Sequence, residues 1–220
     1  MSALWMPVFL VAFLNGAIVY SARHNTPWRM RGLATIQMII IALFGQKLFA
    51  IGGYVSNVAS ICYAAVFVMM VITARLWGLP RAYETIYIIL SAIIVTFVEV
   101  QLISMAETSV GNESFSNAMT QIAIHPAPTL VASSLAFVIA MSVLLGCLRR
   151  WDGWFGLAGA LVLGQAMDSL IFYPIAFYDL PLGSMVEISI VGFVLKILST
   201  IALAPTIWWM LRRRSRKGDG

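Results

Sequence analysis

Eight ionisable or amide side chains interrupt the long apolar stretches of this sequence. They are Gln46, Lys47, Glu99, Gln101, Gln165, Asp168, Glu187 and Lys196. Carboxylates accept hydrogen bonds, a lysine donates them and an amide does both, so such a set could recognise a small polar molecule. A charge in the middle of a bilayer is costly, which predicts that these side chains face other helices or water.

Helical spacing places two of these residues on inward faces. Ala160, Gly164 and Asp168 share one face, which continues a run of small residues from Gly156 and predicts close packing against a neighbour. In the last apolar segment, a similar stripe of small and polar residues contains Lys196. Its members are Ser189, Gly192, Lys196 and Ser199. Asp168 and Lys196 therefore point inward, either as a structural ion pair or as part of a binding site.

The elements that position these residues are membrane-spanning helices. The chain has 220 residues, of which 61% are hydrophobic and 10% charged, too much apolar surface for a soluble core. Runs of about 18 to 20 apolar residues are long enough to cross a bilayer as helix. They predict seven spans, at residues 3–22, 33–52, 57–76, 84–104, 127–147, 155–178 and 185–211. The predicted fold class is an all-α integral membrane protein, a polytopic helical bundle.

The positive charges predict an orientation with the N-terminus outside and the C-terminus in the cytoplasm. Lysines and arginines gather at alternate ends of the spans, whereas residues 52–57, 105–126 and 179–183 contain none. The same bias accounts for the net charge of +5 without a nucleic-acid partner. We expect residues 1–220 to form one transmembrane domain, with a basic cytoplasmic tail at 212–220.

The sequence carries no motif of a conventional enzyme. It has no nucleotide-binding glycine loop, zinc-ligand spacing or nucleophile elbow, so neither catalysis nor a cofactor or metal is predicted. Cys62 and Cys147 would lie near opposite membrane faces and could not pair. The expected partners are a small molecule and the lipid bilayer, with a homo-oligomer as a further option.

Two segments near the C-terminus resemble the queuosine precursor transporter family, which is also called the vitamin-uptake-transporter-like family. The segment 163–172, with the sequence LGQAMDSLIF, followed by Ile175, Ala176 and Phe177, is similar to the signature helix of that family. Glu187 and Lys196 stand where the family carries an acid and a lysine. Further similarity is found at Lys47, Tyr63, Phe67, residues 76–78, Ala132, Ser133, Ala136 and Phe137.

The resemblance covers about residues 45–208 and implies a six-helix core. The first span, at about 3–22, would then be an added N-terminal helix, before a family-like core at about 33–211. This chain departs from the family pattern in the third span at Ala64 and Val71, and in the fifth span at Met141 and Leu144. These differences identify it as a divergent member.

What the resemblance implies is import of a 7-deazaguanine precursor of queuosine across the cytoplasmic membrane of a bacterium. A carboxylate can accept two parallel hydrogen bonds from a guanine-like edge, a role open to Asp168 or Glu187. Gln165 could bind the rest of that edge, and Lys47 or Lys196 could donate to its carbonyl. Phe172 or Tyr63 could cover the ring. The residues expected to bind substrate are Lys47, Glu99, Gln165, Asp168, Ser169, Phe172, Glu187 and Lys196.

Two other functions stay open at this point. A retinal-binding photoreceptor also has seven helices and a lysine in the last one, at the position of Lys196. Against it, the third span holds no carboxylate to serve as counter-ion. The residue one turn before Lys196 is also not an acid, because Gly192 occupies that position. The second alternative is the substrate-capture subunit of a multi-component vitamin importer, which would need a separate ATPase.

Overall fold

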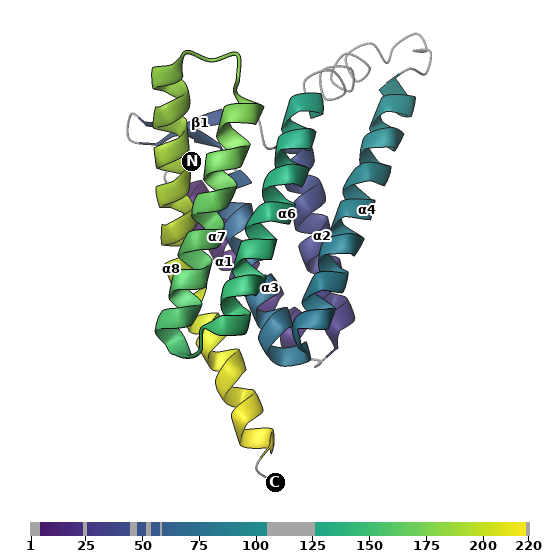
Figure 1. Ribbon diagram of the computed structural model, residues 1–220, viewed down its shortest axis with the longest axis vertical. Coiled ribbons are helices and arrows are strands. Elements are labelled where there is room, and N and C mark those ends of the chain that lie inside the picture. The colour runs from purple at the N-terminus through teal and green to yellow at the C-terminus, as the bar shows by residue number, and fades with distance from the viewer. Residues whose placement is uncertain are drawn as a thin grey trace.

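The computed structural model describes residues 5–23, 26–44, 48–51, 54–57, 59–104 and 126–218. Long helices in this part of the chain pack into a bundle (Figure 1). They are α1 (Trp5–Arg23), α2 (Pro27–Phe44), α3 (Ala59–Trp77), α4 (Leu79–Ser104), α6 (Pro126–Arg150), α7 (Gly153–Ala176) and α8 (Leu182–Gly218). Between α2 and α3, strands β1 (Leu48–Ile51) and β2 (Tyr54–Asn57) pair antiparallel.

Each predicted span overlaps one of the described helices. Within the described residues, five of them are long and apolar enough to cross a membrane, namely α3, α4, α6, α7 and α8. The apolar part of α1, Val8–Ala22, is shorter. The chain is therefore a multi-pass helical membrane protein.

The prediction of a helix over residues 33–52 is wrong at its C-terminal end. Helix α2 ends at Phe44, and the chain continues as the hairpin, in which Leu48 pairs with Asn57 and Ile51 with Tyr54. Consequently α3 begins at Ala59 and not at residue 57. Strand β2 packs against α8, with Ser56 and Asn57 buried. Extended backbone is tolerated at this depth because protein covers it.

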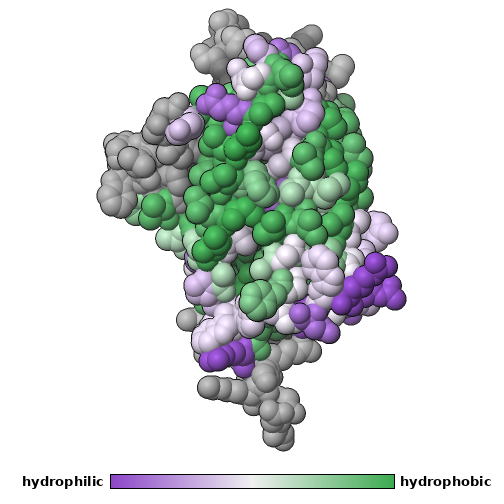
Figure 2. Space-filling model, turned by 60° about the vertical axis from the view of Figure 1, so that its left-hand side comes forward, coloured by the Kyte–Doolittle hydropathy of each residue, from purple (hydrophilic) through white to green (hydrophobic). Residues whose placement is uncertain are grey.

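Helix α3 lies at the centre of the bundle and contacts the other described helices. Nearly all of its side chains are buried, among them Tyr63, Phe67 and Val71. The outer helices instead expose apolar side chains, such as Tyr87 and Ile94 of α4. Figure 2 shows another face of the bundle, where hydrophobic residues form a green belt with hydrophilic residues towards the lower end. A belt of this kind is the surface that lipid covers.

One end of the bundle, which we call the basic end, holds the α3–α4 and α6–α7 connections and the C-terminal end of α8 (Figure 1). Two arginines there converge on one carboxylate. Arg31 of α2 and Arg81 of α4 each lie 2.9 Å from Oε2 of Glu84. Arg31 is 2% exposed, so this contact ties α2 to α4 through a desolvated charge.

The first helix is fastened to the last through polar side chains. Thr206 Oγ1 donates to Asn15 Oδ1 at 2.6 Å, and Asn15 Nδ2 donates to the Ala202 carbonyl at 3.5 Å. Pro205 lies between these two residues of α8 and lacks the N–H that would continue the helical hydrogen bonds. Asn15 thus supplies polar contacts where the proline weakens α8.

Candidate functional site

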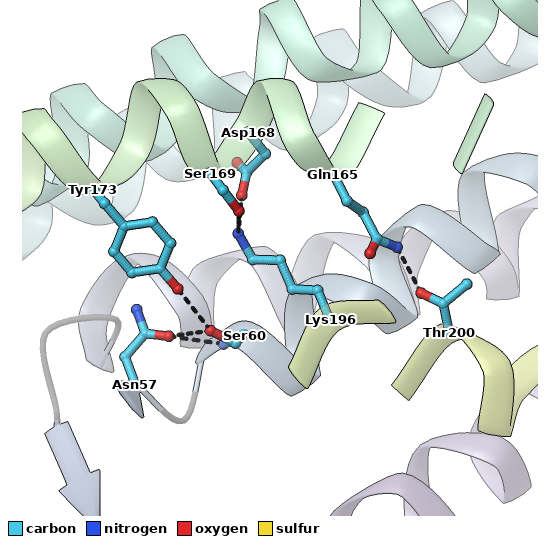
Figure 3. Close-up of polar contacts among 8 residues, drawn as sticks. All are labelled: Asn57, Ser60, Gln165, Asp168, Ser169, Tyr173, Lys196 and Thr200. Atoms are coloured by element: carbon cyan, nitrogen blue, oxygen red, sulfur yellow. Dashed lines mark hydrogen bonds and ion pairs between the residues drawn. The ribbon is translucent and has the colours of Figure 1, made fainter. Parts of the chain in front are cut away.

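A buried ion pair joins the two helices that the sequence singled out. Lys196 of α8 donates from Nζ to Asp168 Oδ2 of α7, and to Ser169 Oγ at 2.9 Å (Figure 3). Lys196 is 2% exposed and Asp168 is 1% exposed. Both charges are therefore removed from water, and each depends on the other for its stability.

Two tyrosine rings surround the lysine. Its Nζ lies 5.4 Å from the ring centroid of Tyr63 and 5.1 Å from that of Tyr173. These cation–π contacts add to the ion pair in a desolvated site. Tyr173 also stacks on Phe177 and meets Phe172 edge to face, so aromatic side chains form one wall of the site.

The end of the site nearer the hairpin is organised by Asn57. Its Oδ1 accepts from the backbone N–H of Ser60 at 3.1 Å and from Ser60 Oγ, as an N-terminal cap does for a helix. Ser60 Oγ lies 3.0 Å from the hydroxyl of Tyr173 (Figure 3). A Cβ at Gly192 would fall 1.7 Å from that hydroxyl, so only glycine leaves room for Tyr173 here.

A second polar contact lies one turn along the same two helices. Gln165 Nε2 donates to Thr200 Oγ1 at 2.6 Å (Figure 3), and the glutamine is fully buried. Gly164 beside it lets α7 approach its neighbours, since a Cβ there would lie 2.7 Å from the Phe67 ring and 3.3 Å from the Ala140 carbonyl. The small-residue face predicted for this helix is confirmed as a close-packed face.

Three buried polar atoms of this region have unused hydrogen-bonding capacity. Asp168 Oδ1, Gln165 Oε1 and the Tyr63 hydroxyl have no hydrogen-bond partner among the residues that the structure describes. An unpaired polar atom in a low-dielectric interior costs about 1 to 3 kcal/mol. Such groups are rare in packed interiors, and each calls for a partner such as a water, an ion or a ligand.

A small cavity adjoins these groups. It is lined by Ile41, Asn57, Ala59, Ser60, Tyr63, Asp168, Phe172 and Lys196. Its volume is about 10 Å³, which is about the space that one water molecule needs. The site is thus closed in this conformation, and a larger molecule would enter only if the surrounding helices separate.

The structure brings together five of the residues predicted to bind substrate, namely Gln165, Asp168, Ser169, Phe172 and Lys196. It does not bring Glu99 or Glu187 to them. Both of these acids are exposed on the outer faces of α4 and α8. Lys47 and Gln46 lie outside the described residues.

Several residues of the site carried no separate signal in the sequence. Asn57, Ser60 and Thr200 are ordinary polar residues near the starts or middles of apolar runs, and Tyr173 was not singled out beside Phe172. Gly192 signals a close approach of α8 to a neighbouring helix, but the sequence does not show that Tyr173 is the side chain opposite it. Only the packing of α3, α7 and α8 brings these residues together.

The positions where the chain departs from the family pattern are all packed. Val71, Met141 and Leu144 are fully buried and belong to the apolar core of the bundle. They fill space between helices and supply no hydrogen bond to the site.

An inward-facing polar cluster at a closed cavity within a helical membrane bundle is the arrangement found in membrane transporters. Comparison with known families agrees with this class. Residues 57–210 match the family model described as "Putative vitamin uptake transporter". The match covers more than half of the chain, and the protein belongs to that family. No curated protein and no solved structure gives a significant match.

Proposed function

We propose that this transporter imports a 7-deazaguanine precursor of queuosine, such as preQ0 or preQ1, or a closely related heterocycle. The substrate class rests on the resemblance of the segment 163–172 to the signature helix of the queuosine precursor transporters. The observation that carries the proposal is the buried Asp168 carboxylate at a closed cavity that Tyr63 also lines, since Oδ1 of Asp168 has no well-aligned hydrogen-bond partner among the described residues.

The chemistry of these groups suits the edge of a guanine-like ring. Such an edge presents N–H donors at N1 and at the exocyclic amine, next to a carbonyl acceptor. Asp168 Oδ1 and Gln165 Oε1 are acceptors for the donors. The ammonium of Lys196 and the hydroxyl of Tyr63 are donors for the carbonyl. A charge-assisted bond to Asp168 would supply the largest share of the affinity.

The aromatic wall supplies the remaining contacts. Phe172 and Tyr63 would cover the faces of a flat heterocycle bound between them. Each offset or edge contact between aromatic rings adds about 0.5 to 1.5 kcal/mol. Because the cavity holds about 10 Å³, we infer that the structure represents an occluded, substrate-free conformation. Substrate would enter when α3, α7 and α8 move apart around Asp168.

The direction of transport follows from the proposed orientation. The basic end would be cytoplasmic by the positive-inside rule, and the hairpin would then face the outside of the cell. The cavity, which Asn57 of β2 helps to line, is on the hairpin side of the Gln165–Thr200 contact. This placement suits capture of a substrate from outside.

Genetic complementation tests the proposal. The gene is expressed in a bacterium that can neither make queuosine precursors nor import them, the medium is supplemented with preQ0 or preQ1, and queuosine in tRNA is measured. We expect queuosine to be restored by the wild-type chain and not by Asp168→Asn at equal membrane abundance. Absence of queuosine with the well-expressed wild-type chain would refute this substrate.

The two alternative functions are not better supported by the structure or by the family. A photoreceptor would give a visible absorbance band when retinal is added to the purified protein, and we expect none. A substrate-capture subunit would co-purify with an ATPase and a coupling protein, whereas a complete carrier transports alone. Reconstituted transport by the single purified chain therefore separates our proposal from the capture-subunit function.

A further inference from the structure

A groove separate from the Asp168 cavity opens between α4 and α6 at the basic end. Its walls are formed by Tyr83, Val143, Gly146, Cys147, Arg149, Arg150 and Trp151. The groove encloses about 660 Å³. That is well within the size range of small-molecule binding sites in proteins.

The two arginines of the groove have neither an ion-pair nor a cation–π partner in the described part of the chain, whereas Arg29 and Arg212 lie over the rings of Tyr20 and Trp208. Arg31 and Arg81 pair with Glu84, and Arg75 lies 3.7 Å from Asp152. Arg149 and Arg150 are exposed, and in the described part of the chain neither forms an ion pair. Two adjacent positive charges are thus left for an external anion.

The hollow beneath these charges comes from a glycine on the same helical face. Gly146 precedes Arg149 by three residues and Arg150 by four, which places it under both guanidinium groups. A Cβ built on Gly146 would meet no atom within 4 Å, so the space beside it is open. Val143, one turn deeper into the bundle, continues the apolar floor.

Aromatic side chains place the groove at the level of lipid headgroups. Tyr83 is 41% and Trp151 40% exposed, and both line the groove where two membrane-spanning helices meet the basic end. Tyrosine and tryptophan are enriched at that depth because their rings are apolar and their polar atoms reach water. The ligand must therefore have an anionic head at the surface and an apolar part directed into the membrane.

We propose that this groove binds an anionic phospholipid, with its phosphate against Arg149 and Arg150 and an acyl chain over Gly146 and Val143. Basic pockets between transmembrane helices bind such headgroups through the same chemistry. A favourable interaction of the arginines with the C-terminal dipole of α6 accounts for positive charge at this position. It does not account for an open hollow next to that charge.

The test compares lipid retention by the purified full-length chain. Wild type and variants are mixed with phosphatidylglycerol or with zwitterionic phosphatidylcholine, and bound lipid is counted by native mass spectrometry. We expect selective retention of phosphatidylglycerol by wild type. Each arginine near an anionic surface contributes about fivefold in affinity, so Arg149→Gln with Arg150→Gln should weaken retention about 30-fold. The double change to lysine should keep most of it.

Two further variants separate the hollow from the net charge. Gly146→Leu places an apolar side chain in the open space beside the glycine and should reduce retention while both arginines remain. Arg29→Gln removes one positive charge from α2, outside the groove, and should leave retention unchanged. Size-exclusion chromatography checks that each variant is folded.

Three results would overturn the proposal. Equal retention of phosphatidylcholine would show that binding does not depend on the charge of the headgroup. Unchanged phosphatidylglycerol binding by the folded Arg149→Gln, Arg150→Gln variant would place the lipid elsewhere. Displacement of the lipid by millimolar inorganic phosphate, with phosphate bound in its place, would make this a site for a soluble anion.

Discussion

Replacing Lys196 of the buried ion pair should lower the free energy of unfolding more than replacing Asp168. In Lys196→Met, the Asp168 carboxylate loses its hydrogen bond at Oδ2, while Oδ1 has no partner among the described residues. In Asp168→Asn, Lys196 keeps Ser169 Oγ at 2.9 Å and both tyrosine rings. Removing one partner of a buried pair costs about 3 to 5 kcal/mol. We assign the upper end of this range to Lys196→Met and the lower end to Asp168→Asn.

Thermal unfolding of the protein in lipid nanodiscs measures these differences. For a chain of this size, 1 kcal/mol corresponds to about 2 to 4 °C in Tm, so Asp168→Asn should lower Tm by about 6 to 12 °C and Lys196→Met by more. The double variant leaves no unpaired charge and should recover most of the loss. If Lys196→Met were no less stable than Asp168→Asn, the assignment of the contacts around Lys196 would be wrong.

The same variants separate a structural role from a role in binding. If the pair served stability alone, the double variant would regain transport together with its Tm. We expect it to regain Tm and to stay inactive, because the substrate contacts at Asp168 Oδ1 and Lys196 Nζ are gone. Uptake by the double variant comparable to wild type would refute the site.

Three other predictions follow from single positions. Gly192→Ala should displace Tyr173 and therefore lower both Tm and uptake. Gly146→Ala, with open space around it, should change Tm by less than the equivalent of about 0.5 kcal/mol. Thermal unfolding of the two variants tests this difference. Tyr63→Phe removes a hydroxyl that interacts with the buried Asp168 carboxylate, so it should lower Tm slightly and raise the KM for uptake; an unchanged KM would remove Tyr63 from the site. A reporter fused after Gly220 should signal cytoplasm, and a periplasmic signal would reverse the proposed orientation.

Much of the helical architecture could be predicted because the membrane imposes it. A chain in lipid must satisfy its backbone hydrogen bonds within each segment, so long apolar runs are helices and their ends can be located to a few residues. The failure at residues 33–52 has a physical cause. Strand β2 packs against α8 with Ser56 and Asn57 buried, so protein covers the backbone there and it need not be helical. Gly52 and Gly53 between two four-residue runs are in fact a hairpin signal in the sequence.

The residues of the candidate site could likewise be predicted only in part. Asp168 and Lys196 could be predicted as inward-facing, because a buried charge in a membrane is costly and helical phase assigns it a face. Glu99 was predicted from its residue type, and Glu187 from its residue type and from its match to the acid of the family; neither criterion identifies an exposed position. The contacts of Tyr63, Tyr173 and Ser60 could not be predicted, because they depend on how three helices pack.

Transport by the purified protein tests the central claim most directly. The chain is reconstituted alone into liposomes, and accumulation of labelled preQ1 is compared between wild type and Asp168→Asn. We predict saturable accumulation by wild type that unlabelled substrate competes away, and none above empty liposomes by Asp168→Asn. Equal accumulation by the two proteins would contradict the claim that the Asp168 cavity is the substrate site.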